Sequence, residues 1–349
     1  MDNRIYLISP DKKQYKANLH CHSVFSDGKK TPEELKEMYQ RNGYSILAIT
    51  DHETPKSHNE LTDSDFIMIT GYECYIRPTE GGRGDIFTRE IHLNLFARDP
   101  ENETMICYNN RYLKYMDEEA KDALTKAGSE RPREYTTEYI NEYIHTAQKN
   151  GYLVSYNHPY WSRETEARIL SYEGYFSMEL CNYSAYIMNH LEYNAPLYDM
   201  MLSHGKHVFC HSGDDNHNLY PEDDPKCDSY GAFTMMMPEE FTYGGIIDAM
   251  EKGEMYSSMG PTFKEIYLEG DKLHVECSEV VQICVYFGSK IPRHELAPKG
   301  CTMTSADFTI HPESRYIRVS IFDKYGKSAD TRGFFRDELG MPPLEEQEM

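Results

Sequence analysis

Apolar and polar positions follow two alternating periods along the first two thirds of the chain. Short runs that are almost entirely apolar predict buried strands over residues 44–52, 65–74, 90–99, 152–159, 175–182 and 206–217. Between them, apolar residues that recur every three to four positions predict helices, most clearly over residues 31–43, 136–151 and 194–205. Alternation of strand and helix is typical of a parallel sheet with helical crossovers, so this region is predicted to be an α/β domain.

The helix over residues 31–43 carries a complete set of end signals. Thr31 is placed to cap its N-terminus, Pro32 follows at the first helical position, and Glu34 completes a capping box. Gly43 supplies the residue type that most often ends a helix. The boundaries of this helix are therefore predicted from local chemistry alone.

The pattern changes near residue 260. Segments 260–288 and 316–330 alternate with a period of two and are broken by turns, which predicts antiparallel β structure. We therefore expect an α/β domain over residues 1–259 and a small β-rich, sandwich-like domain with a polar tail over 260–349. A polar, irregular stretch at 99–133 is expected to be an insertion or lid, with a short helix in 116–124.

Charge and cysteine content exclude several classes of partner. The net charge of −22 disfavours duplex nucleic acid and anionic membrane surfaces, since both attract basic proteins. The N-terminus lacks a basic start followed by an apolar stretch, and no run approaches 18 apolar residues, so neither a signal peptide nor a membrane span is expected. The nine cysteines are scattered and never spaced as CxxC, which indicates reduced thiols and a cytoplasmic protein.

Residues of the types that bind metals gather where the predicted strands end. They are His20, His22, Asp27, His52, Glu73, His92, His158, Asp215 and His217. Each has an ordinary alternative as a core, capping or loop residue, but their recurrence at one edge of a repeated architecture favours a shared site. Imidazole and carboxylate without thiolate suit Zn, Mn or Fe. Two residues on a strand, such as His20 and His22, point the same way at a spacing of two and can hold one ion.

Six stretches occur in an order that resembles one known family, the polymerase and histidinol phosphatase (PHP) superfamily. They are "NLHCHSVFSDG", "AITDHE", "GYECY", "IHLNLF", "YNHPY" and "GDDNH". The resemblance covers the first three quarters of the chain and implies a distorted, TIM-like (β/α)7 barrel with two or three divalent metal ions. It assigns His20, His22, Glu73 and Asp215 to a first ion, Asp27, His52 and His217 to a second, and His92 and His158 to a third that Glu73 bridges to the first.

The activity implied is hydrolysis of a phosphate ester, either a small phosphomonoester or a cyclic phosphodiester. A water bound between the metals would become hydroxide and attack phosphorus in line. Asp215 and His217 are expected to take part in catalysis, and Arg163 to bind the phosphate, because it follows His158 in the same loop and guanidinium binds phosphate bidentately. Arg83 and Arg89, in a glycine-rich loop, are the alternatives to Arg163.

Two other functions stay open from the sequence. Metal-activated water would also serve a hydrolase of C–N or C–O bonds, and a chain that retained its metals could be a binding module without catalysis. The insertion and the aromatic loops near residues 160 and 183 could shape a pocket for a small organic phosphate or form a packed lid. The partner expected is thus a small phosphorylated substrate, with no role assigned to the C-terminal β domain beyond support.

Overall fold

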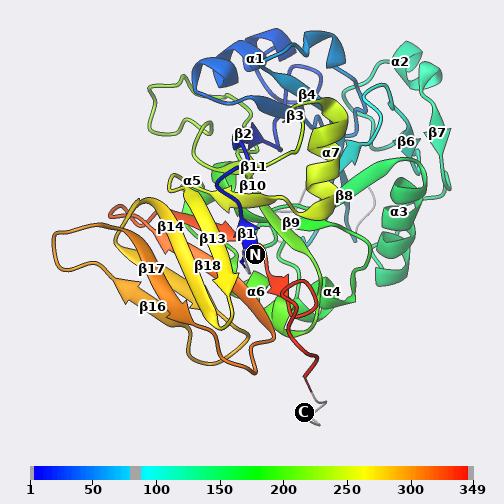
Figure 1. Cartoon of the computed structure of the whole chain (residues 1–349). Helices are drawn as coiled ribbons and strands as arrows, with labels where there is room; N and C mark the ends of the chain where they lie inside the picture. The colour runs from blue at the N-terminus through cyan, green and yellow to red at the C-terminus, as the bar shows by residue number, and fades with distance from the viewer. Residues whose placement is uncertain (1–3, 79–87, 345–349) are drawn as a thin grey trace.

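The computed structural model describes residues 4–78 and 88–344, and its first helix illustrates how local sequence sets an element. Helix α1 spans Pro32–Arg41 (Figure 1). The amide of Glu34 donates to Thr31 Oγ1 at 3.3 Å, and the amide of Thr31 donates to the Glu34 carboxylate at 2.9 Å. The predicted capping box is confirmed.

A single mixed sheet of 14 strands runs through most of the described chain. The strands before residue 260 are β2 (Tyr15–Asn18), β3 (Ile46–Ile49), β4 (Ile67–Ile76), β5 (Ile91–Ala97), β8 (Tyr152–Tyr156), β9 (Ser177–Asn182), β10 (Phe209–Gly213), β11 (Phe233–Met236) and β12 (Met255–Ser258). Those after it are β15 (Gln282–Tyr286), β16 (Arg293–Leu296), β18 (Tyr316–Phe322), β19 (Ser328–Thr331) and β20 (Phe334–Phe335). Neighbours follow the order β10-β9-β8-β5-β4-β3-β2-β11-β12-β19-β18-β15-β16, and β20 pairs with β18.

The predicted strands are present, but the predicted parallel pairing holds only in part. β2, β3 and β4 pair in parallel, as do β8, β9 and β10. β5, however, is antiparallel to both β4 and β8, and β11 is antiparallel to β2 and β12. A parallel return needs a crossover of a dozen or more residues, usually a helix, and the glycine-rich segment 77–90 lacks a helical period. The fold is therefore mixed α/β, and a (β/α)7 barrel is not confirmed.

The sheet curls so that its first strand, β10, returns to β2. The amide of Asp215 donates to the carbonyl oxygen of His20 at 2.9 Å, and Cys21 forms an isolated parallel bridge with Asn216. β10 also contacts β11, the neighbour of β2 in the sheet: the amide of Ser212 in β10 donates to Oγ1 of Thr234 in β11 at 3.0 Å. Side chains that follow β2 and β10 are therefore brought into one region although nearly 200 residues separate them in the chain.

Helices lie around this curled sheet (Figure 1). They are α3 (Thr137–Lys149), α4 (Glu166–Ser171), α5 (Tyr183–Asn189), α6 (Ala195–Ser203), α7 (Tyr243–Lys252) and the 3-10 turn η1 (Asn59–Leu61). α3 shows the general principle, since Tyr139, Ile140, Tyr143, Ile144 and Ala147 are all buried on one stripe. That stripe joins a core that includes strand residues of β5 and β8, which fixes the helix against the sheet.

The insertion at 99–133 is part of the packed structure. It contains β6 (Met105–Ile106), the predicted short helix as α2 (Glu118–Ala123), and β7 (Lys126–Ala127). Met105, Ile106 and Leu113 are buried in the same core cluster as α3. The insertion is therefore held against the body of the protein by apolar packing.

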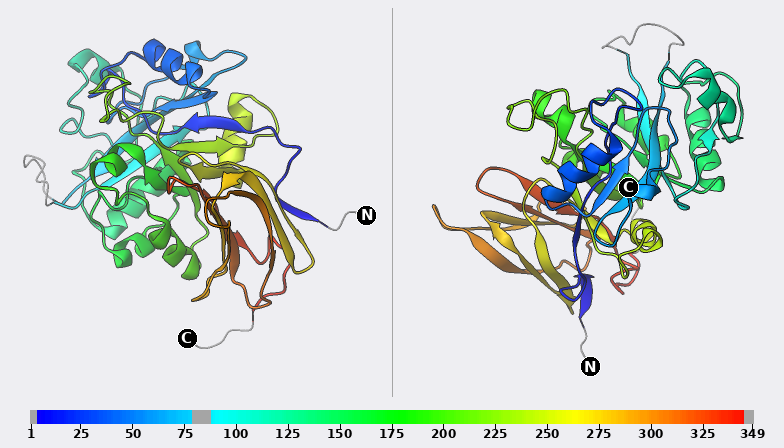
Figure 2. Two further views of the ribbon diagram at one scale, coloured as in Figure 1. Left: turned by 90° about the vertical axis from the view of Figure 1, so that its left-hand side faces the viewer. Right: turned by 90° about the horizontal axis from the view of Figure 1, so that it is seen from above.

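Beyond residue 260 the predicted antiparallel β structure is confirmed. A four-stranded sheet with the order β1-β13-β14-β17 contains β1 (Ile5–Ile8), β13 (Phe263–Glu269), β14 (Lys272–Val280) and β17 (Met303–Thr309). It shares one buried core with β15, β18 and β19 of the large sheet. The N-terminal strand thus runs beside the C-terminal strands (Figure 2), although the predicted boundary assigned it to the other domain.

The two parts of the chain are also joined by main-chain pairing. β12 pairs with β19, with Tyr256 opposite Thr331. The C-terminal β structure therefore covers an edge of the α/β part, and the domain boundary near residue 260 stays a prediction. Within the ranges that the structure describes, no helix has both the length and the apolar character to cross a membrane.

Candidate metal centre

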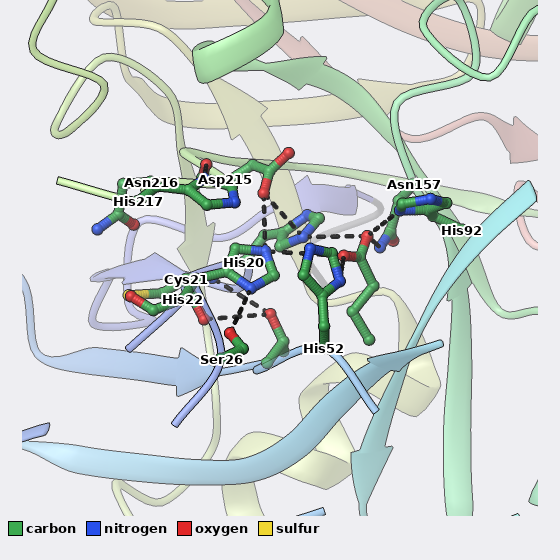
Figure 3. A network of polar contacts seen from close by, with 12 residues as sticks. His20, Cys21, His22, Ser26, His52, His92, Asn157, Asp215, Asn216 and His217 are labelled. Atoms are coloured by element: carbon green, nitrogen blue, oxygen red, sulfur yellow. Dashed lines mark hydrogen bonds and ion pairs between the residues drawn. The ribbon is translucent and has the colours of Figure 1, made fainter. Parts of the chain in front are cut away.

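The nine predicted ligand residues converge on one region of the structure. They are His20 and His22 after β2, Asp27 in the following turn, His52 after β3, Glu73 within β4, His92 within β5, His158 after β8, and Asp215 and His217 after β10. Figure 3 labels His20, His22, His52, His92, Asp215 and His217 among them. Asp215 and His158 have φ angles of 53° and 26°. Such angles cost non-glycine residues energy and persist only where the surrounding structure imposes them.

Glu73 lies at the middle of this group and is almost completely buried. Its Oε1 is 3.2 Å from His20 Nε2, 3.1 Å from His92 Nδ1 and 3.3 Å from His158 Nε2. Its Oε2 is 2.9 Å from His52 Nδ1. The two oxygens therefore face two different sets of imidazoles, as a carboxylate that bridges two cations would.

A second set of contacts surrounds Asp27 and Asp215. Asp27 Oδ1 is 3.4 Å from His217 Nε2, and its Oδ2 is 3.6 Å from His52 Nε2. Asp215 Oδ1 is 2.9 Å from His22 Nε2 and 3.2 Å from the Nε2 atom of His20. Asp27 thus joins histidines that follow two different strands, β3 and β10, whereas Asp215, which follows β10, contacts the two histidines that follow β2.

Three sets of ligand atoms in this region converge closely enough to hold an ion. They are His22, Asp27, His52 and His217; His20, His22 and Glu73; and His52, Glu73 and His92. The first set contains the predicted Asp27, His52 and His217 together with His22, and the second contains the predicted His20, His22 and Glu73 without Asp215. The third set contains His52 where the prediction has His158, which lies outside all three sets although its Nε2 is 3.3 Å from Glu73 Oε1 and its ring centroid is 4.8 Å from that of His92.

Partners behind the ligands fix which imidazole nitrogen faces the centre. Buried Glu179, in β9, accepts a hydrogen bond from His20 Nδ1 at 2.7 Å, which leaves Nε2 pointing at the Glu73 carboxylate. In the same way, His217 Nδ1 donates to the carbonyl oxygen of Asp215 at 2.9 Å. Such hydrogen bonds set the tautomer and ring orientation of metal-binding histidines. The sequence analysis missed Glu179; a glutamate within an apolar strand was the available signal, since buried glutamates are almost always paired.

The charges of the centre depend strongly on one another. Burial and the neighbouring His217 lower the pKa of His22 to about 4. Burial also disfavours the charged form of His92, but Glu73 and Glu90 outweigh it and raise the pKa of His92 to about 10. Conversely, the imidazoles hold the pKa of Glu73 well below its usual value despite its burial. The carboxylates are therefore balanced by imidazolium protons, which divalent cations would displace.

The residues present fit divalent metal ions. Among the described residues, His20 Nε2, His52 Nδ1 and Glu73 Oε2 are buried without a hydrogen bond of acceptable geometry, and all three point into the centre. Buried polar atoms without partners are costly, and metal coordination would satisfy them. Nitrogen and oxygen donors without thiolate are the set expected for Zn, Mn or Fe at a hydrolytic site.

A cavity of about 340 Å³ opens onto the centre. Besides candidate ligands, its lining includes Arg77, Lys114, Tyr115, Trp161 and Met188. The side chains of Arg77 and Lys114 lie 4.6 and 5.5 Å from the ring centroid of the intervening Tyr75. Lys114 and Tyr115 come from the insertion, so this segment shapes the cavity as well as packing on the core.

The comparison with family models decides the family. A model described as the PHP domain matches residues 18–200, just over half of the chain. The chain belongs to the PHP domain family. The match includes seven of the nine ligand residues and ends before Asp215 and His217, which the fold of this PHP domain protein nevertheless brings to the same centre.

Two solved structures are similar to this PHP domain protein at low identity. One is a two-domain protein from Bacteroides vulgatus, described as containing a predicted PHP-like metal-dependent phosphoesterase, with 14% identity over 93% of this chain and 87% of that chain at a TM-score of 0.42. The other is an amidohydrolase from Chromobacterium violaceum with bound sulfate and no metal, with 16% identity over 58% and 87% at 0.39. Both similarities are remote and say nothing of the substrate here. The comparison with curated proteins finds no match.

Arg163 and Arg89 do not line the cavity of this PHP domain. Arg163 is exposed, lies 5.0 Å from the ring centroid of Tyr160, and is not among the residues that line the cavity. Arg89 is also exposed and outside the lining, and Arg83 lies outside the described residues. The reason is local: the loop after His158 turns back through a positive φ at Arg163, and it is Trp161 that lines the cavity. Arg77 and Lys114 are the arginine and the lysine that line the cavity among the described residues, and phosphate binding by Arg163 stays a prediction.

Proposed function

We propose that this protein hydrolyses a phosphate ester with two or three divalent metal ions held at the candidate centre. The ions would be bound by His20, His22, Glu73 and Asp215; by Asp27, His52 and His217; and by His92 and His158 together with Glu73. When bound, they would polarise the phosphoryl oxygens and lower the pKa of a water molecule. The substrate is a small phosphomonoester or a cyclic phosphodiester.

The observation that carries this proposal is the position of Glu73. A buried carboxylate with one oxygen facing His20, His92 and His158 and the other facing His52 has no evident role as a plain ion pair. It suits a bridge between cations roughly 3.5–4 Å apart, which is the spacing at which both the attacking and the leaving oxygen of a displacement are stabilised.

The remaining side chains bind and orient the substrate. Arg77 and Lys114 provide two positive charges in the cavity, the feature that a phosphate needs on a protein with a net charge of −22. Trp161 and Met188 provide apolar surface beside them, suited to an organic leaving group. Tyr115 donates a hydrogen bond to Asp27 Oδ2 at 3.3 Å and so helps to hold that carboxylate.

The decisive experiment measures hydrolysis of a panel of phosphomonoesters and cyclic diesters by protein loaded with Mn²⁺, Zn²⁺ or Fe²⁺, and by chelator-treated protein. We expect release of phosphate or ring opening with at least one metal, and loss of activity after chelation. No turnover of any ester by protein that carries its full metal content would contradict the proposal and favour a C–N or C–O hydrolase or a binding module.

The cations of the cavity give a sharper test. Losing one charge-assisted hydrogen bond costs roughly 1.5–3 kcal/mol, so Arg77→Ala and Lys114→Ala should each lower kcat/KM by about 10- to 150-fold with metal content unchanged. Arg163→Ala is the matched comparison, an arginine outside the cavity lining, and should stay near the wild-type value. A loss confined to Arg163→Ala would restore the sequence-based assignment.

Three wider features belong to the same proposal. The return of β10 to β2 supports the distorted (β/α)7 barrel that the family resemblance implies. The change in strand pattern supports a β-rich domain from residue 260 onward. A cytoplasmic location is supported by the state of the nine cysteines, all of which are free thiols.

A further inference from the structure

A buried ion pair lies between the candidate centre and the insertion. Arg133 Nη1 and Nη2 donate to Glu53 Oε1 and Oε2 at 2.5 and 2.7 Å, a two-point contact. Both side chains are at most 1% exposed. Neither residue is a candidate metal ligand, and neither lines the cavity.

Glu53 connects this pair to the candidate ligands. It directly follows His52 and has a φ of 51°, in the left-handed region that non-glycine residues rarely adopt. Its amide donates to the carbonyl oxygen of Glu73 at 2.8 Å, and its carboxylate accepts from the amide of Tyr75 at 3.0 Å. The turn that presents His52 is therefore tied to β4 through Glu53.

Arg133 connects the same pair to the wall of the cavity. It is the last residue of the insertion, and its Nη1 also donates to the carbonyl oxygen of Tyr75 at 2.8 Å. Its guanidinium lies 4.2 Å from the ring centroid of Tyr112. Tyr112 lines the cavity and belongs to the same segment as Lys114 and Tyr115, which also line it. One side chain therefore contacts the turn after His52 through Glu53, the strand that carries Glu73, and the segment that supplies the cavity lysine.

We propose that Arg133 is a positioning residue that sets the His52 turn and the 112–115 wall relative to each other. It acts through Glu53 and Tyr112 and does not touch substrate. Guanidinium is needed because its planar fork makes two parallel bonds to Glu53 and still donates to Tyr75, whereas lysine offers a point charge. The effect on substrate rests on the proposed function, but the effect on metal binding does not.

A purely structural pair is the alternative, because removal of one partner of any buried ion pair is destabilising. The chain offers a matched control in Arg318, which is equally buried and pairs with Asp330 at 3.2 Å. Arg318 contacts β19 and α6 and approaches none of the nine candidate ligands in the described structure. Arg133→Lys and Arg318→Lys therefore make the same chemical change at two buried sites, only one of which adjoins the centre.

The experiment measures Zn²⁺ affinity by competition with a chromophoric chelator, together with thermal unfolding, for the full chain and both variants. Loss of a hydrogen-bond partner behind a metal ligand typically weakens binding 10- to 100-fold, so we expect a decrease of about that size for the weakest-bound ion in Arg133→Lys. Arg318→Lys should keep wild-type affinity even where its unfolding temperature falls. Equal Zn²⁺ affinities in Arg133→Lys and wild type would overturn the proposal.

A second variant covers the case in which Arg133→Lys does not fold. Glu53→Gln with Arg133→Gln removes both charges and leaves no unpaired ion in the core. It should also bind the weakest ion about 10- to 100-fold less tightly, and wild-type affinity there would overturn the proposal equally. On the best phosphate ester, Arg133→Lys should raise KM as well, since the wall carrying Lys114 shifts. If no ester is turned over by wild type, the proposed function fails while the Zn²⁺ measurement still decides the role of Arg133.

Discussion

Replacing Glu179 with glutamine should disturb the centre although every candidate ligand residue is kept. Glu179 Oε1 accepts from His20 Nδ1 at 2.7 Å, while Oε2 accepts from the amide of His158 at 2.8 Å and from Asn182 Nδ2 at 3.0 Å. All three partners donate hydrogen bonds, so an amide NH₂ group, itself a donor, would face another donor in place of either carboxylate oxygen. Glutamine keeps the volume and must choose between two unfavourable orientations.

The two orientations bound the size of the effect. With its NH₂ group toward His158 and Asn182, glutamine loses two hydrogen bonds worth about 0.5–1.5 kcal/mol each. With the NH₂ group toward His20, it donates to Nδ1, and the imidazole proton moves to Nε2, the atom that faces Glu73 and would bind metal. A wrong tautomer or a lost partner behind a ligand weakens metal binding about 10- to 100-fold, which is roughly 1.4–2.7 kcal/mol. In the first orientation His20 keeps its acceptor, so the loss of about 1–3 kcal/mol falls on folding stability. In the second orientation a loss of similar size falls on metal affinity.

The assay is Zn²⁺ competition against a chelator, with circular dichroism to confirm the fold. Glu192→Gln is the control, because Glu192 is also buried and accepts three hydrogen bonds, but from the amides of Tyr160 and Trp161 and from Asn194. It should bind Zn²⁺ as wild type does. Wild-type Zn²⁺ affinity together with an unchanged unfolding temperature in Glu179→Gln would refute the view that this carboxylate fixes the centre through His20, His158 and Asn182.

Three further outcomes follow from the structure. Glu73→Gln should lower the metal content by at least one ion per chain, measured by elemental analysis, while the fold is retained; full content would make Glu73 an ordinary strand carboxylate. In metal-free protein, the pKa of His92 is raised from 6.5 to about 10, so its stabilising charge is present below pH 6.5 and lost as pH rises toward 10. The unfolding temperature of chelated protein should therefore fall from pH 6.5 to 9.5, with a shallower slope in His92→Gln, and a rising temperature would contradict this. A chain ending at residue 259 should be insoluble because it loses the strand that pairs with β12, whereas one ending at 344 should stay soluble; a soluble, metal-binding short form would show that the β structure is dispensable.

Much of the local structure could be predicted because the determining interactions are local. The capping box of α1 joins two residues only three positions apart, and the apolar runs that became β3, β4 and β8 are buried over their whole length. The candidate ligands were also visible, since His20 and His22 are two residues apart and the others lie in or just after the apolar runs, apart from Asp27 in the turn after His22. The family match over residues 18–200 bears out the family that those motifs indicated.

Strand direction was decided by the tertiary structure. The apolar runs show that β4 and β5 are buried, but a fully apolar strand looks the same in parallel and antiparallel pairing. The pairing of β1 with β13 joins the N-terminal segment to the C-terminal part, and the pairing of β12 with β19 joins strands that other strands separate along the chain. No sequence pattern specifies such partners.

The residues around the centre were decided in the same way. Glu179 acts on His20 across 159 positions of sequence, and Arg133 acts on Glu53 across 80. Arg163 stood next to a ligand in sequence, yet its loop turns it to the surface, while Arg77 and Lys114 reach the cavity from a strand end and from the insertion. Residue types and their order along the chain determined which chemistry is present. Because hydrogen bonds and charges act over a few ångströms, only the folded arrangement decided which groups orient the ligands and which cations face the cavity.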